Sequence, residues 1–197
     1  MRTGLAAVTL AAVLAVVGCS RSDRSAPRAA EADAGPVFDV ETMAFLSKAR
    51  ALHHEANLRE EGGDLRGAAA QMERIVRANR PHPGQVVPEV EEVLADAWAR
   101  LAELDLRTGE LKGAEKAAKE GLTHAREPTY FRGHLLEVQG IAEESRFAAL
   151  ADAGDSRGAE KARAAAMRLL EEAVAVQDQV IADALDAGIG PSEGGRP

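Results

Sequence analysis

The chain has 197 residues, of which 46% are hydrophobic, 28% are charged and only 3% are aromatic. With so few aromatic residues and so many alanines, the composition favours one all-α domain of closely packed helices over a β-sandwich. The formal net charge of -8 argues against binding to nucleic acid, because an acidic surface repels the phosphate backbone. The chain has one cysteine, Cys19, so it cannot form an intrachain disulfide.

The first segment, residues 1–18, has the features of a secretory signal. Met1-Arg2 gives it a short positive start, and an apolar stretch follows from Leu5 to Val17 that only Thr9 interrupts. This stretch is shorter than the roughly 20 residues that a membrane-spanning helix requires. We therefore predict an export signal and no transmembrane helix.

The end of this segment, Val16-Val17-Gly18-Cys19, resembles the lipobox of bacterial lipoproteins. The resemblance implies that the peptide is cleaved before Cys19 and that this cysteine carries acyl chains, which together anchor a protein stably to a membrane. Ser20 follows, where an aspartate is the family's signal for retention in the inner membrane. In a cell with two membranes, the resemblance therefore implies the periplasmic face of the outer membrane. The alternatives are an ordinary signal peptide with a chance cysteine, or a buried helix.

The chain after the lipobox divides into a tether, a helical domain and a tail. Residues 19–36 are predicted to form the lipidated cysteine and a flexible tether, because they are polar and rich in alanine, serine and proline. Residues 188–197 are rich in glycine and proline, and we predict that they are disordered. The helical domain therefore spans residues 37–187.

Within this domain, apolar residues recur at helical spacing. The clearest runs extend from Leu65 to Val76, from Val90 to Leu104 and from Ala159 to Ala184. Three related turns separate such runs, and each places glycine before a residue that can cap the next helix. The turns are Gly63-Asp64-Leu65-Arg66-Gly67-Ala68, Gly109-Glu110-Leu111-Lys112-Gly113-Ala114 and Gly154-Asp155-Ser156-Arg157-Gly158-Ala159. We predict about three antiparallel helical hairpins.

The second hairpin resembles a tetratricopeptide repeat (TPR). Trp98-x2-Leu101-Ala102 precedes Gly109 at that family's spacing, and Ala114, Ala118 and Leu122 follow it. The first hairpin has matching residues at Leu52, Ala56, Gly63, Ala68, Met72 and Ile75. For the third hairpin two registers are open, one set by Gly154 and the other by Gly140 with Ala166. The resemblance implies that the hairpins stack as a short right-handed solenoid.

In TPR proteins the first helix of each hairpin lines a concave surface that binds partners. The matching positions here are Arg50, His53, Asn57, Glu60, Asp96, Arg100, Glu103, Arg107 and Glu144. The leading hypothesis is a membrane-anchored adaptor that holds a protein or peptide segment of the bacterial envelope on this surface. The alternative is a structural lipoprotein that forms a homodimer through an apolar stripe of its last helix, at Val180, Ile181 and Ala184.

A third hypothesis is a serine hydrolase, because Gly154-Asp155-Ser156-Arg157-Gly158 matches the G-x-S-x-G motif. That motif needs a preceding strand, and the sequence predicts helices on both sides. His53-His54-Glu55 lacks the spacing of four residues that a helical metal-binding pair requires. We therefore expect no catalytic residue, no metal and no cofactor.

Overall fold

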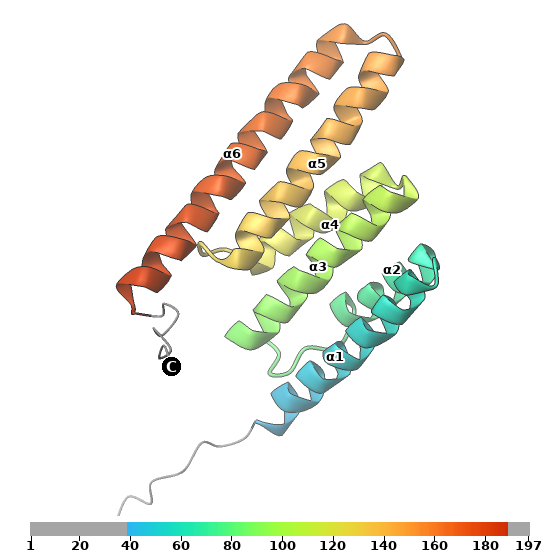
Figure 1. Ribbon diagram of the computed structural model, residues 1–197. Coiled ribbons are helices and arrows are strands. Elements are labelled where there is room, and N and C mark those ends of the chain that lie inside the picture. Colours follow the sequence, from blue (N-terminus) through green and yellow to red (C-terminus); the bar gives the residue numbers. More distant parts are fainter. Residues whose placement is uncertain (1–38, 189–197) are drawn as a thin grey trace, which may run out of the picture. The chain divides into compact units, whose positions relative to one another are not determined.

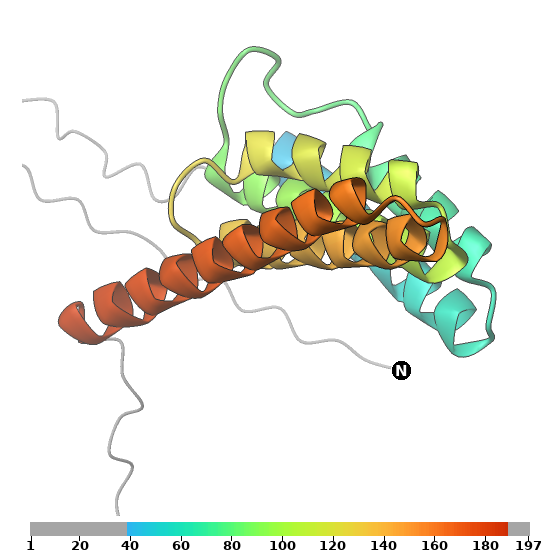
Figure 2. The same ribbon diagram turned by 90° about the horizontal axis from the view of Figure 1, so that it is seen from above.

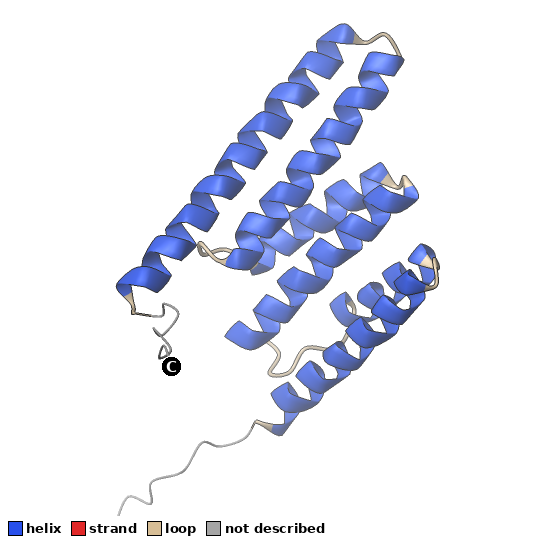
Figure 3. Cartoon of the chain, viewed as in Figure 1, coloured by secondary structure: helices blue, strands red, loops and turns tan. Residues whose placement is uncertain are grey.

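The computed structural model describes residues 39–188, which contain six α-helices and no strand (Figure 1, Figure 3). The helices are α1 (Val40–Glu61), α2 (Leu65–Val76), α3 (Pro88–Thr108), α4 (Leu111–His124), α5 (Tyr130–Asp152) and α6 (Ser156–Asp186). The all-α prediction is confirmed for this part of the chain. The predicted signal segment, Cys19, the tether up to Pro36 and most of the predicted tail lie outside the described residues.

The six helices pair in chain order as three hairpins, α1 with α2, α3 with α4, and α5 with α6 (Figure 1). Neighbouring hairpins pack through α2 against α3 and through α4 against α5. The first helices also touch one another, because α3 contacts both α1 and α5. Among the second helices α2, α4 and α6, no Cα atoms of different helices come within 8 Å of one another.

The three repeated turns have one structural explanation. Gly63, Gly109 and Gly154 have positive φ angles of 80°, 81° and 77°, a conformation that glycine adopts without strain. In each turn the next residue donates its backbone N–H to a carbonyl five residues back, which is the bond that closes a Schellman motif. Each copy of the repeated turn sequence therefore forms the C-terminal cap of a helix.

The second glycine of two of these turns makes room for a helix cap. The Asp64 and Asp155 carboxylates accept hydrogen bonds from the backbone N–H groups of Gly67 and Gly158, both at 2.9 Å. A Cβ atom at Gly67 would lie 1.9 Å from the Asp64 carboxylate, so a larger residue would disrupt this cap. The predicted capping role is confirmed for the two aspartates, whereas Glu110 makes no such side-chain bond.

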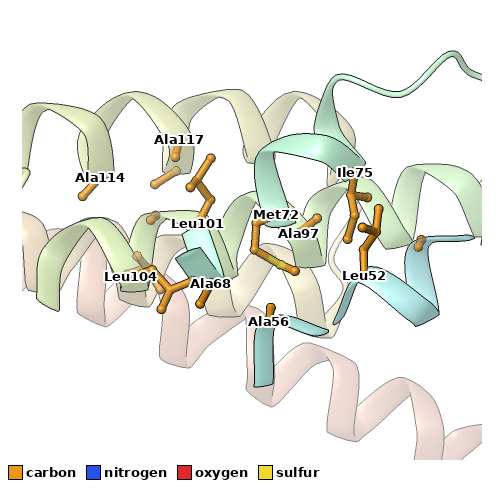
Figure 4. Packing of buried hydrophobic residues seen from close by; sticks show 14 residues of the cluster. Leu52, Ala56, Ala68, Met72, Ile75, Ala97, Leu101, Leu104, Ala114 and Ala117 are labelled. Carbon is orange, nitrogen blue, oxygen red and sulfur yellow. The ribbon is translucent and has the colours of Figure 1, made fainter. Parts of the chain in front are cut away.

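The main hydrophobic core lies between the first two hairpins (Figure 4). Met72, Ile75 and Leu104 are fully buried there. Alanines fill most of the remaining contact positions and let the helix backbones approach closely; they are Ala49, Ala56, Ala68, Ala97, Ala102, Ala114, Ala117 and Ala118. The TPR-matching residues Ala68, Met72, Ala114 and Ala118 are therefore core residues.

The third hairpin packs through small residues and has the longest helix. A Cβ atom at Gly140 of α5 would meet the Leu170 side chain of α6 at 2.8 Å. The turn between the two helices lies at Gly154, as in the first of the two predicted registers. Gly140, which set the second register, lies inside α5 at a close contact with α6. The Gln177 side chain donates to the Tyr130 carbonyl at 3.2 Å, and α6 continues past this point to Asp186 (Figure 1).

Candidate functional site: the face of α1, α3 and α5

The predicted partner-binding residues lie on the first helices α1, α3 and α5, and several of them bind one another. Glu60 of α1 accepts hydrogen bonds from the guanidinium groups of Arg100 and Arg107, both on α3. The side chain of Glu60 is only 18% exposed. This carboxylate therefore joins two helices through two charge-assisted hydrogen bonds.

The network continues from α3 to α5. Arg100 also contacts Glu103 at 3.4 Å, and the other Glu103 oxygen lies 3.2 Å from Nε2 of His134 on α5. His134 contacts Glu137 one turn later at 3.6 Å. Glu60, Arg100, Glu103 and His134 thus form a continuous chain of ionic contacts across three helices, which we call the inter-helix network.

Other predicted residues lie outside the inter-helix network. Nε2 of His53 is 3.5 Å from the Asp96 carboxylate, which makes a second link between α1 and α3. Burial lowers the pKa of His53, an effect that nearby Asp96 opposes. Arg50, Asn57 and Glu144 are exposed, and within residues 39–188 they make no ion pair or side-chain hydrogen bond. Of the predicted partner-binding residues, all but these three therefore form ion pairs with other side chains of the domain.

His134 is a network member that the sequence did not reveal. Its spacing from Glu137 is typical of a helical ion pair, but nothing in the sequence indicates that Glu103 lies opposite. The hydrogen bond to Glu103 raises the pKa of His134, and the same bond lowers the pKa of Glu103. The Tyr130 ring also stacks on His134, with ring centres 6.0 Å apart. This contact therefore favours the protonated form of the histidine beside an ionised carboxylate.

We predict that Glu103→Gln lowers the pKa of His134, which an NMR titration of the ring protons would measure. Because His134 binds its proton more tightly and Glu103 less tightly in the folded state, the pair stabilises the fold fully only between the ordinary pKa values of glutamate, about 4.5, and of histidine, about 6.5. This contribution, on the order of 1 kcal/mol or less, is lost as the pH rises through the raised pKa of the folded state. Glu137→Gln, at a more exposed carboxylate, serves as the control and should have the smaller effect. An unchanged His134 pKa in Glu103→Gln would contradict the pairing.

A pocket of about 660 Å³ lies on another part of the domain. It is formed by the connector between α2 and α3, which loops away from the helices in Figure 2, and by the ends of α3 and α4. Val86, Pro88 and Phe131 supply apolar lining, and Glu91 binds Arg80 at 3.4 Å and His124 at 2.6 Å. The pocket was not predicted, because its walls depend on how an irregular connector folds back.

The hydrolase and metal hypotheses gain no supporting geometry. Ser156 is exposed at the first position of α6, where the preceding Asp155 is the helix cap. In the described part of the chain no histidine makes a hydrogen bond to it. Residues 39–188 also contain no group of three histidine, cysteine or acidic side chains that could hold a metal ion. Among the same residues no helix is long and apolar enough to span a membrane.

Comparisons of the chain with protein-family models, with curated proteins and with solved structures find no match. The resemblances to the lipobox and to TPR repeats therefore remain predictions from the sequence. The function has to be inferred from the described helices and from these motifs.

Proposed function

We propose that this protein is a membrane-anchored adaptor of the bacterial cell envelope, which binds a segment of a partner protein on the face of α1, α3 and α5. The observation that carries the proposal is the pattern of helix contacts. The backbone of α3 comes within 8 Å of α1 and α5, whereas the backbones of the second helices stay farther apart than this. This pattern supports a row of hairpins that curves toward its first helices, and we infer a short TPR-like solenoid with α1, α3 and α5 on its inner side.

The inter-helix network supports this proposal because it makes the face rigid. Glu60, Arg100 and Glu103 bind one another, so they hold the first helices in register before any partner arrives. A preorganised surface loses less conformational entropy on binding than a flexible one. Ionic links that join all three first helices are therefore suited to a binding face.

The exposed residues beside the network define the chemistry that a partner needs. Arg50 supplies a cation, and Asn57, two helical turns further along α1, supplies both a donor and an acceptor. Together they suit an extended segment that presents a carboxylate and backbone amide groups. The net charge of -8 makes nucleic acid a poor partner, and the proposal requires neither catalysis nor a cofactor.

We expect the double variant Arg50→Glu, Asn57→Ala to lose its partner when the tagged protein is crosslinked in its native envelope. Both side chains are exposed, so the fold should persist. Recovery should fall by roughly tenfold, which corresponds to a loss of about 1.4 kcal/mol of binding free energy. Mass spectrometry of the crosslinked peptides would identify the partner and the contact site.

The matched control is Lys119→Glu, which changes the net charge by the same amount as Arg50→Glu at an exposed position of α4. It should leave partner recovery unchanged. If both variants recover the same partners as the wild type, the face of α1, α3 and α5 is not the binding surface and the proposal is wrong.

A further inference from the structure

Helix α6 carries a row of large apolar side chains on its exposed surface. Met167, Val174 and Ile181 follow one another at intervals of seven residues, and Leu185 lies one turn beyond. Their exposed fractions are 55%, 61%, 58% and 64%. We call these four residues the α6 stripe. A seven-residue apolar repeat on one helix is typical of a surface that packs against a second helix.

The apolar stripe that the homodimer hypothesis predicted for the last helix is confirmed only in part. Val180 and Ala184 are half-buried, and Ile181 alone of the three predicted residues is exposed. The contacts between α5 and α6 set the rotation of α6, and they turn Met167 and Val174 outward together with Ile181. The exposed stripe is therefore longer than the predicted one.

The charges along α6 are strongly separated. Residues 156–168 contain four basic side chains and one acidic one, namely Arg157, Lys161, Arg163, Arg168 and Glu160. Residues 169–186 contain no basic side chain and five acidic ones, namely Glu171, Glu172, Asp178, Asp183 and Asp186. This order opposes the helix dipole, which favours acidic residues near the start of a helix and basic residues near its end. The charge pattern therefore does not stabilise α6 on its own.

We propose that α6 pairs with α6 of a second copy of this chain in antiparallel orientation, about a two-fold axis at Val174. Antiparallel pairing places the basic half of each helix against the acidic half of the other. The even spacing of the α6 stripe then puts Met167 of each copy opposite Ile181 of the other, with Val174 opposite Val174. A parallel pair would instead align like charges along its whole length.

The pair is a weak, reversible dimer. A stable interface buries about 800 Å² on each partner, and four apolar side chains on one helix bury less than this. The charges contribute mainly orientation and specificity, because exposed ion pairs stabilise by about 1 kcal/mol or less. The α6 stripe shares no residue with the face of α1, α3 and α5, so dimer formation and partner binding are measured independently.

The test is thiol crosslinking of the full chain in intact cells, with a bismaleimide that spans about 10 Å, the separation of packed helix axes. Val174→Cys should crosslink to itself. Met167→Cys alone and Ile181→Cys alone should not crosslink. In an antiparallel pair centred on Val174, the two copies of either residue lie 14 residues apart along the pair, which is about 21 Å. Co-expressed, differently tagged Met167→Cys and Ile181→Cys chains should crosslink to each other. The wild type, whose one cysteine is Cys19, is the blank.

Charge reversal gives the matched control. Arg163→Glu with Arg168→Glu should reduce the Val174→Cys crosslink by roughly tenfold, and Asp183→Lys with Asp186→Lys in the same chain should restore it. All four positions are exposed, so the fold is preserved. Self-crosslinking at all three single cysteines would establish a parallel pair and overturn the proposal. Absence of a Val174→Cys product, or its replacement by a crosslink to another protein, would also overturn it.

Discussion

Replacing Met72 with alanine is expected to lower the free energy of unfolding by about 2 to 5 kcal/mol. Met72 is fully buried in α2, and its side chain packs among residues of α1 and α3, including Leu52 and Ala97 (Figure 4). The neighbouring side chains are themselves packed in the core, so the cavity left by the substitution closes only in part. For a domain of this size the loss corresponds to a fall in Tm of roughly 10 °C, which calorimetry or urea unfolding would measure.

Met43→Ala is the matched control, since it removes the same atoms from a methionine that is 52% exposed on α1. Its effect should stay within about 0.5 kcal/mol. If the two variants were equally stable, the first two hairpins would not share the core described above. A large loss for both would instead indicate that α1 is less exposed at Met43 than in this structure.

The sequence predicts this fold well where one residue type has one structural role. Gly63, Gly109 and Gly154 mark the hairpin turns because few other residues tolerate a positive φ there. In α2, α3 and α6 the apolar residues recur regularly at helical spacing. Helices α1 and α5 were harder to delimit, because α1 also exposes apolar residues such as Leu58, and α5 buries Gly133 and Gly140 where larger apolar residues would be expected.

The candidate site is less predictable, because its contacts join residues that are distant in the chain. The repeat spacing places Glu60 and Arg100 on first helices, but their hydrogen bond spans 40 residues and depends on how two hairpins pack. The link from Glu103 to His134 depends on the next hairpin in the same way. The rotation of α6, which exposes Met167 and Val174, is likewise set by tertiary contacts and not by helical periodicity.

Cys19→Ala is expected to abolish labelling of the protein by radioactive palmitate and to move it from the membrane fraction to the soluble fraction of the envelope. The reason is chemical, because a lipobox is acylated through its cysteine sulfur and the chain has no other cysteine. If Cys19 is acylated as we propose, each acyl chain would contribute roughly 0.8 kcal/mol of membrane binding for every buried CH₂ group, and the variant would lose this contribution.

The control for this prediction is Ser20→Asp, which keeps the acylated sulfur and introduces the residue that retains lipoproteins in the inner membrane. It should remain labelled and shift from the outer to the inner membrane on a density gradient. Label that persists in Cys19→Ala would mean that the lipid is attached elsewhere. If the wild type takes up no label, residues 1–18 are an ordinary export signal and not a lipoprotein signal. The helical domain would then not share a membrane with its partner, and binding would lose the increase in effective concentration that a shared membrane provides.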